Sequence, residues 1–74
     1  MRLELRWSED ADARWHSVYL LCRGRWRLVE VLPASTPGMR LTRANLRDLR
    51  VGAVAVAAVD RCGNESARAV RGVP

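Results

Sequence analysis

Hydrophobic and polar residues alternate along most of this chain with a period of two. The clearest case is the segment 51–60, VGAVAVAAVD, in which valine and alanine fill both alternating sets of positions. Alternation of this kind, rich in β-branched residues and followed by a turn cluster at 60–66, predicts a β-strand. Because both of its faces are apolar, we place this strand at the centre of a sheet, with one face in the core and the other covered or partly wet.

The same alternation predicts further strands on both sides of this segment. They cover residues 2–7, 14–22, 25–32, 39–43 and 67–73. Residues 44–49 are expected to form a single helical turn, whose leucines Leu46 and Leu49 close the end of the core. Short strands with regularly spaced turn signals predict an all-β sandwich, with a small barrel as the alternative.

The dipeptide Arg23-Gly24 predicts a tight two-residue turn between the second and third strands. Such a turn places Cys22 opposite Arg25, Leu21 opposite Trp26 and Tyr19 opposite Leu28. An aromatic patch is therefore expected on one face of this hairpin. The residues proposed for an interaction surface there are Trp15, Tyr19, Trp26 and Arg25.

At 74 residues the chain is expected to be one domain spanning 1–74. Its net charge is +5 and every cation is an arginine. A basic chain is compatible with an anionic partner such as nucleic acid. These arginines are spread along the sequence and not clustered, which indicates that they mostly lie on a solvent-exposed face of the strands. No apolar run is long enough to predict a membrane span, and strand-like sequence directly after Met1 gives no sign of a signal peptide.

The residues that usually carry chemistry are few and scattered. The only histidine, His16, shares a face with Val18 and Leu20, so a core or edge histidine is expected. No serine or cysteine has a histidine placed to activate it. The two cysteines, Cys22 and Cys62, are too few for a zinc site. We therefore predict a protein that is not an enzyme, with no metal and no cofactor.

Nearly the whole chain resembles a known family. The order LRW, SVYLL, GRWRLVEV, LRDL-x-VG and AVAAVDRCGNES is similar to a fibronectin type III domain. Residues 56–66, with the pattern V-x-A-x-D-R-x-x-N-E-S, resemble the penultimate strand and final hairpin of such domains in bacterial secreted proteins. The likeness is greatest to the C-terminal module of glycosyl-hydrolase-like proteins.

This resemblance implies an immunoglobulin-like sandwich of two sheets. One sheet would hold the second, third, fifth and sixth strands, and the other the first and fourth. The first of the usual seven strands is missing, which leaves an exposed edge along 2–7 and allows an edge-strand dimer. In this topology Cys22 and Cys62 lie about 25 Å apart, at opposite ends of neighbouring strands. A disulfide needs Cα atoms within about 7 Å, so two free thiols are predicted.

The final hairpin is expected to have a structural role. Asp60, Asn64 and Ser66 are residues that accept hydrogen bonds from turn N–H groups, and Gly63 accommodates a positive φ. Asp60 with Arg61 is expected to lock the base of this hairpin.

The resemblance implies an accessory module of a secreted or envelope protein, and so an extracytoplasmic location. Such a module would act as a spacer or packing partner, appended to a carbohydrate-active enzyme, with its aromatic patch docked on a neighbouring domain or another protein. The alternative is a module that binds polysaccharide through the same rings. A third possibility, ranked last, is a nucleic-acid binder that uses Arg23, Arg25, Arg27 and Trp26.

Overall fold

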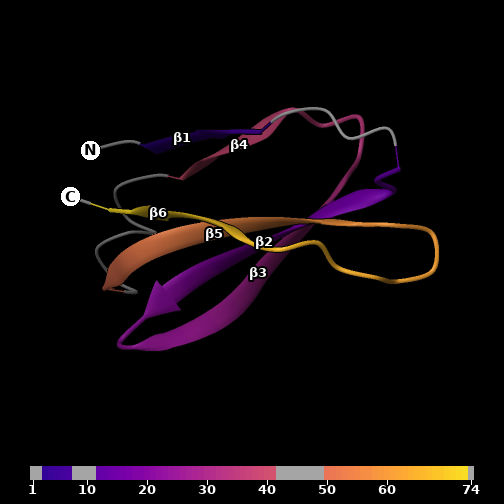
Figure 1. Ribbon diagram of the computed structural model, residues 1–74. Coiled ribbons are helices and arrows are strands. Elements are labelled where there is room, and N and C mark those ends of the chain that lie inside the picture. The colour runs from indigo at the N-terminus through magenta and orange to yellow at the C-terminus, as the bar shows by residue number, and fades with distance from the viewer. Residues whose placement is uncertain (1–2, 8–11, 42–49, 74) are drawn as a thin grey trace.

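The computed structural model describes residues 3–7, 12–41 and 50–73, and within these residues every regular element is a strand. Figure 1 shows the strands in chain order. They are β1 (Leu3–Arg6), β2 (Trp15–Cys22), β3 (Arg25–Pro33), β4 (Gly38–Leu41), β5 (Val51–Val59) and β6 (Ala69–Gly72). The predicted strands are thus confirmed, with small shifts at their ends. The helical turn predicted at 44–49, with Leu46 and Leu49, lies outside the described residues.

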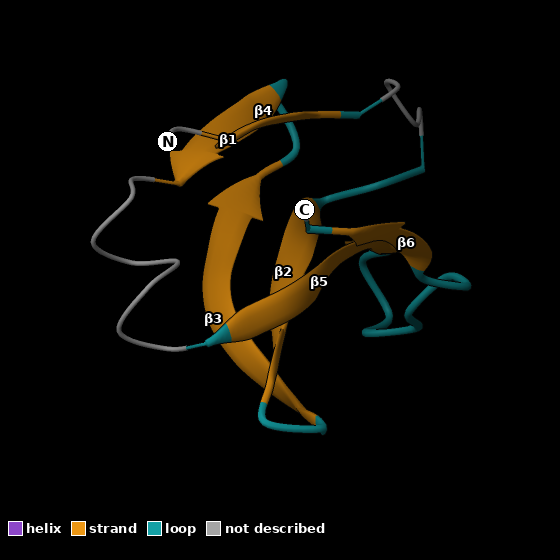
Figure 2. Ribbon diagram, turned by 90° about the vertical axis from the view of Figure 1, so that its left-hand side faces the viewer, coloured by secondary structure: helices purple, strands orange, loops and turns teal. Residues whose placement is uncertain are grey.

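The strands form two antiparallel sheets that face each other. The larger sheet has the order β3-β2-β5-β6, and the smaller one pairs β1 with β4. Figures 1 and 2 show the small sheet lying over one face of the large one. This all-β arrangement is that of a small sandwich, and its strand order is the predicted one. No helix of the described residues has the length and hydropathy needed to cross a bilayer.

The core lies between the two sheets. Its buried cluster consists of Leu20, Cys22, Val54 and Leu41, against which the half-buried Leu5 and Met39 pack. Leu41 points inward, as predicted. We call the side of the large sheet that carries this cluster the inner face. Burying a leucine contributes about 2 kcal/mol, so these contacts are what hold the small sheet to the large one.

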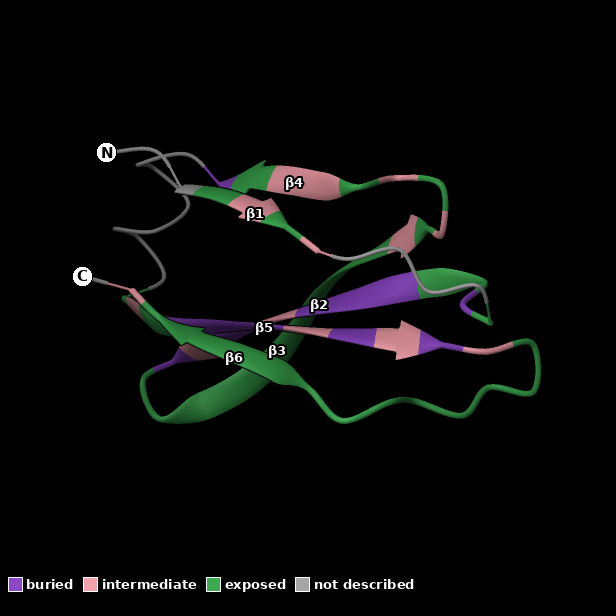
Figure 3. Cartoon of the chain, turned by 45° about the horizontal axis from the view of Figure 1, so that its top comes forward, coloured by how far each residue is buried: buried purple, intermediate pink, exposed green. Residues whose placement is uncertain are grey.

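The opposite side of the large sheet, the outer face, has no layer of described residues over it. Ala53, Ala55 and Ala57 of β5 are nevertheless buried there. Their small side chains lie between larger neighbours, since Ala55 stands opposite both Tyr19 of β2 and Val70 of β6. Figure 3 shows the result, with β2 and β5 largely buried at the centre and β3 and β6 exposed at the edges.

The β2–β3 hairpin follows the predicted register near its turn. Arg23 and Gly24 have φ values of 53° and 79°, as a two-residue turn of this type requires. The predicted pairing holds for Cys22 with Arg25, Leu21 with Trp26 and Tyr19 with Leu28. Beyond Tyr19 a β-bulge makes Val29 an extra residue, so that Val18 pairs with Glu30. Every later residue of β3 is therefore on the side of the sheet opposite to the one that simple counting gives.

Both cysteines are free thiols, which confirms the prediction. Cys22 ends β2 and is buried in the core, while Cys62 is exposed in the turn after β5. The antiparallel pairing places Cys22 opposite Val51 at the start of β5. Cys62 lies beyond the other end of the same strand, so the length of β5 separates the two thiols.

Candidate interaction surface

The outer face gathers most of the exposed large apolar side chains of the described residues. Those with the greatest exposed fractions are Trp15 (41%), Trp26 (38%), Leu28 (55%), Val31 (50%) and Val70 (56%). Residues that stand opposite each other in an antiparallel pair point to the same side of the sheet. The cross-strand partners of all five residues point to the outer side, so the five lie on the outer face. Exposed apolar patches that extend over several strands mark interaction sites.

Tyr19 lies at the centre of this face and is already engaged. Its hydroxyl donates a hydrogen bond to the carboxylate of Glu65. The guanidinium carbon of Arg68 lies 3.8 Å from the centroid of the Tyr19 ring, and Arg68 also pairs with Glu65 at 3.2 Å. The segment between β5 and β6 thus covers one side of the tyrosine and leaves the five exposed apolar side chains of the outer face open.

This contact shifts the pKa of both of its acidic members. The hydrogen bond to Glu65 is the main reason that the pKa of Tyr19 is raised above 10.0, because it favours the protonated phenol. The same bond is the main reason that the pKa of Glu65 is lowered below 4.5, with further contributions from Arg68. The neutral phenol and the ionised carboxylate are therefore the forms present near neutral pH.

Arg25, expected on the aromatic patch, lies on the other side of the sheet. It pairs with Cys22, whose side chain is in the core cluster, and Arg27 pairs with the buried Leu20. Both arginines therefore belong to the inner face of β3, where they are exposed at the edge of the sheet. Trp26 points to the outer face between them. The rings of the patch and the guanidinium groups of β3 do not form one surface.

The hairpin after β5 has the bonds that a closed turn needs. Oδ1 of Asp60 accepts hydrogen bonds from the backbone N–H groups of Cys62 and Asn64, each at 2.9 Å, and Gly63 has a φ of 84°. Oγ of Ser66 accepts the N–H of Ala58 at 2.9 Å. The bond from the Asn64 N–H is the main cause of the lowered pKa of Asp60.

Two details of this hairpin differ from expectation. The side-chain amide of Asn64 donates a hydrogen bond to Oδ2 of Asp60, at 3.3 Å, where an acceptor role was expected. Arg61 is exposed and is not among the partners of Asp60 in the described hairpin. The turn is therefore closed by hydrogen bonds from backbone N–H groups to the Asp60 carboxylate, and not by an ion pair. These groups can reach each other because they lie within one seven-residue segment.

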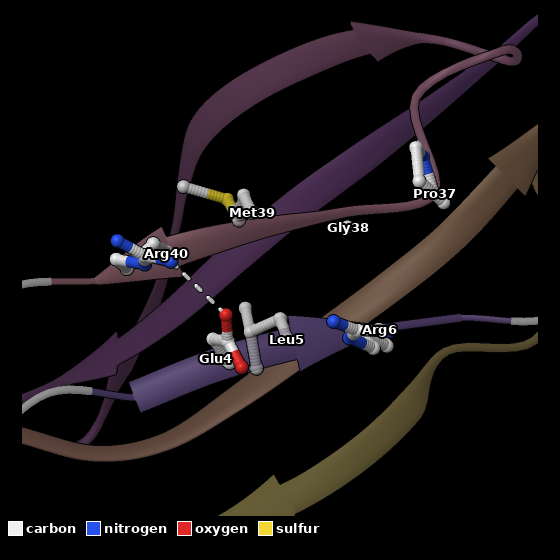
Figure 4. Close-up of a pocket in the computed structure, with 7 residues that line it drawn as sticks. All are labelled: Glu4, Leu5, Arg6, Pro37, Gly38, Met39 and Arg40. Carbon is white, nitrogen blue, oxygen red and sulfur yellow. Dashed lines mark hydrogen bonds and ion pairs between the residues drawn. The ribbon is translucent and has the colours of Figure 1, made fainter.

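A groove of about 380 Å³ runs along β1 and β4, and its lining includes the core-packed Leu5 and Met39 as well as charged residues (Figure 4). Glu4 and Arg40 form an ion pair across it at 3.2 Å, and both side chains are about half exposed. Arg6 and Gly38 line the groove further along. Exposed pairs of this kind contribute little energy, so the groove is a solvated surface of the sheet.

His16 lies in the core, as the alternation predicted. It is 3% exposed, and its ring centroid is 5.2 Å from that of the half-buried Trp7. Trp7 in turn donates its indole N–H to the backbone oxygen of Thr36 at 3.0 Å. A space of about 250 Å³ lies beside the two rings, but Nδ1 of His16 is buried and has no hydrogen-bond partner. The contact that His16 makes here is the one between its ring and that of Trp7, while its buried Nδ1 is unsatisfied, which costs free energy.

Two members of the outer face were not foreseen from the sequence. Strict alternation from Leu28 would put Val31 on the inner face, but the β-bulge at Val29 turns it outward. Val70 stands opposite Ala55, a register that the weak alternation of residues 67–73 does not reveal.

Within the described residues, no three side chains of histidine, cysteine, aspartate or glutamate lie close enough to hold a metal ion.

Comparison of the chain with protein-family models, with curated proteins and with solved structures finds no match.

Proposed function

We propose that this chain is a fibronectin type III-like, non-catalytic interaction module that docks through the outer face of its large sheet against an apolar surface of another protein domain. One observation supports this most. Trp15, Trp26, Leu28, Val31 and Val70 are exposed on the same side of one sheet, over which no layer of described residues lies. Covering such a face with protein removes apolar surface from water at about 25 cal/mol per Å².

The composition of the face favours a protein partner over a polysaccharide. Its most exposed members, Leu28, Val31 and Val70, are aliphatic. Sugar sites combine flat rings with several polar groups that bind hydroxyls. Here the hydroxyl of Tyr19 is bonded to Glu65, and Arg68 covers the ring. A glycan-binding module therefore remains the second candidate.

The separation of rings and arginines counts against nucleic-acid binding. Proteins that bind single strands place cationic groups beside the rings on which bases stack. Trp26 lies on the outer face, whereas Arg25 and Arg27 pair with core-facing residues of β2. No single approach of a strand would engage all three.

The proposed setting rests on the resemblance of residues 56–66 to the final hairpin of accessory modules. We propose that the domain belongs to a secreted or envelope bacterial protein, appended to a carbohydrate-active enzyme. The bonds that Asp60 and Ser66 make in this hairpin support a structural role for the motif. The outer face then packs on the neighbouring domain.

Site-specific photo-crosslinking in the cells that make the protein tests this proposal. A crosslinker replaces Leu28 or Val70 on the outer face, and Arg71 serves as the control because it is exposed but pairs with the core-facing Val54. We expect one discrete protein adduct, or one intramolecular crosslink to another domain, from both outer-face positions and not from Arg71. Equal yield from Arg71, or no adduct from either outer-face position, contradicts docking.

A fluorescence titration separates the glycan alternative. If soluble polysaccharides change the tryptophan emission of the chain, and Trp26→Ala abolishes that change, the outer face binds sugar and the protein-docking proposal is wrong. We expect no change with any polysaccharide.

A further inference from the structure

We infer that β3 also pairs with β3 of a second copy of this chain, antiparallel, with Arg27 of each copy opposite Glu30 of the other. This interface is formed by the backbone edge of β3, whereas the proposed docking uses side chains on the outer face, so that Trp26, Leu28 and Val31 border both surfaces.

The edge offered by β3 is long and carries several exposed apolar side chains. β3 has nine residues and, among the described strands, pairs with β2 alone. Leu28, Val29 and Val31 are all exposed along it. A strand at a sheet edge carries a row of unpaired backbone N–H and C=O groups, and a long apolar one favours pairing with another chain. The other edge of the large sheet, β6, has only four residues, as do β1 and β4.

The bulge of β3 decides which registers are possible. In an antiparallel pair, opposite residues must point to the same side of the sheet. Arg27, before the bulge, and Glu30, after it, both lie on the inner side, since their partners in β2 are Leu20 and Val18. Pairing Arg27 with Glu30 of the second copy therefore keeps every side chain on its own face. It also places Trp26 opposite Val31 of the second copy, both on the outer side.

Side-chain direction and charge select this register over its two neighbours. Pairing around a centre one residue earlier would place Arg27 opposite Leu28 of the second copy, and these two point to opposite sides of the sheet. Pairing around a centre one residue later would place Arg27 opposite Leu32 of the second copy and Glu30 opposite Val29, with no ion pair. In the proposed register the two-fold axis generates the Arg27–Glu30 contact twice. Neither residue has an ion pair within its own chain among the described contacts. Both charges are thus available to a second copy.

Sedimentation velocity over about two decades of protein concentration tests the dimer, because self-association appears as a concentration-dependent shift. Arg27→Glu or Glu30→Arg alone places like charges opposite each other twice, and we expect either to weaken dimerisation about 10-fold. The double variant R27E/E30R restores opposite charges and is expected to recover the original affinity. R71E is the matched control, since Arg71 lies on the same side of the sheet but at β6, and it should leave the affinity unchanged.

Isotope-filtered NMR then checks the register. In a mixture of labelled and unlabelled chains, we expect NOEs between the ring of Trp26 in one copy and the methyl groups of Val31 in the other. The two residues are five positions apart along one strand and roughly 15 Å from each other, so the contact does not arise within a chain. A monomer at every concentration overturns the inference. So does a dimer that the single variants leave intact, or one that the double variant fails to recover.

Discussion

The hydroxyl of Tyr19 donates a hydrogen bond to the carboxylate of Glu65, which lies 46 residues later in the chain. This contact joins the middle of β2 to the segment between β5 and β6. Arg68 completes it, with its guanidinium over the tyrosine ring and an ion pair to Glu65. The three residues fix the path of this segment beside the outer face, and therefore define which part of that face stays open to a partner.

Replacing Tyr19 with phenylalanine removes this hydrogen bond and keeps the ring under Arg68. We expect the free energy of unfolding to fall by at most about 1 kcal/mol, since the pair is partly exposed. The pKa of Glu65 should rise towards its ordinary value, because the bond is the largest cause of its lowering. Urea denaturation and carboxyl-carbon NMR titration measure the two effects. An unchanged Glu65 pKa in Tyr19→Phe would show that the bond does not form.

The same contact makes stability depend on pH at both ends of the scale. The folded-state pKa of Glu65 is lowered, so its contribution is present above about pH 4.5 and is lost as the pH falls through the folded value. The folded-state pKa of Tyr19 is raised, so its contribution is present below pH 10.0 and is lost as the pH rises through the folded value. Thermal melts of wild-type and Tyr19→Phe chains should therefore differ most between these limits and converge beyond them.

Gly38 is predicted to tolerate no side chain. A Cβ atom at this position would lie 2.1 Å from the backbone oxygen of Leu5 in the paired strand β1. Gly38→Ala must push β1 and β4 apart, and we expect it to cost about 1–3 kcal/mol. Gly72→Ala is the control, because nothing lies within 4 Å of a Cβ there, and it should be neutral or slightly stabilising. Equal melting temperatures for the two variants would contradict the β1–β4 pairing.

The turn after β5 is predicted to loosen in acid. The folded-state pKa of Asp60 is lowered by hydrogen bonds from Asn64 and Cys62, so the turn is stabilised above about pH 3.8 and loses this support as the pH falls through the folded value. Asp60→Asn should remove the pH dependence and speed hydrogen exchange at the Cys62 and Asn64 amides near neutral pH. If hydrogen exchange at these two amides is equally slow in Asp60→Asn, groups other than the Asp60 carboxylate close the turn.

The two thiols are predicted to react at very different rates. Cys62 is exposed, whereas Cys22 is 7% exposed in the core cluster. In the folded chain a thiol reagent should modify Cys62 at once and Cys22 only at the rate of unfolding, while in denaturant both react together. Cys62→Ser should abolish the fast phase. A fast phase that survives this substitution would mean that the β2 end of the core is open.

The parts of this fold that follow period-two patterns could be predicted from the sequence. The central position of β5 follows from its two apolar faces, and the hairpin register near Arg23-Gly24 follows from the turn. The sheet order came from a resemblance and not from the pattern, because alternation fixes which face a residue occupies but not which strand lies beside it.

The outer face could be predicted only in part. The sequence correctly placed four residues on one face: Trp15, Tyr19, Trp26 and Leu28. Val31 was missed because no residue type near Val29 predicts the bulge there. Arg25 was also included in the patch, but it is next to Trp26 along β3, and neighbours along a strand point to opposite sides. The engagement of Tyr19 by Glu65 and Arg68 joins residues too far apart in the sequence for local pattern to reveal.

The outer face is predicted to be open in the isolated chain and covered in its native setting. Hydroxyl-radical footprinting of the purified chain and of the protein in its cells compares the two directly. Trp15 and Val70 are the reporters, because both are exposed on the outer face and neither belongs to β3. We predict strong modification of both residues in the purified chain and protection of both in the cells. Equal modification in the two settings would contradict the docking of this face.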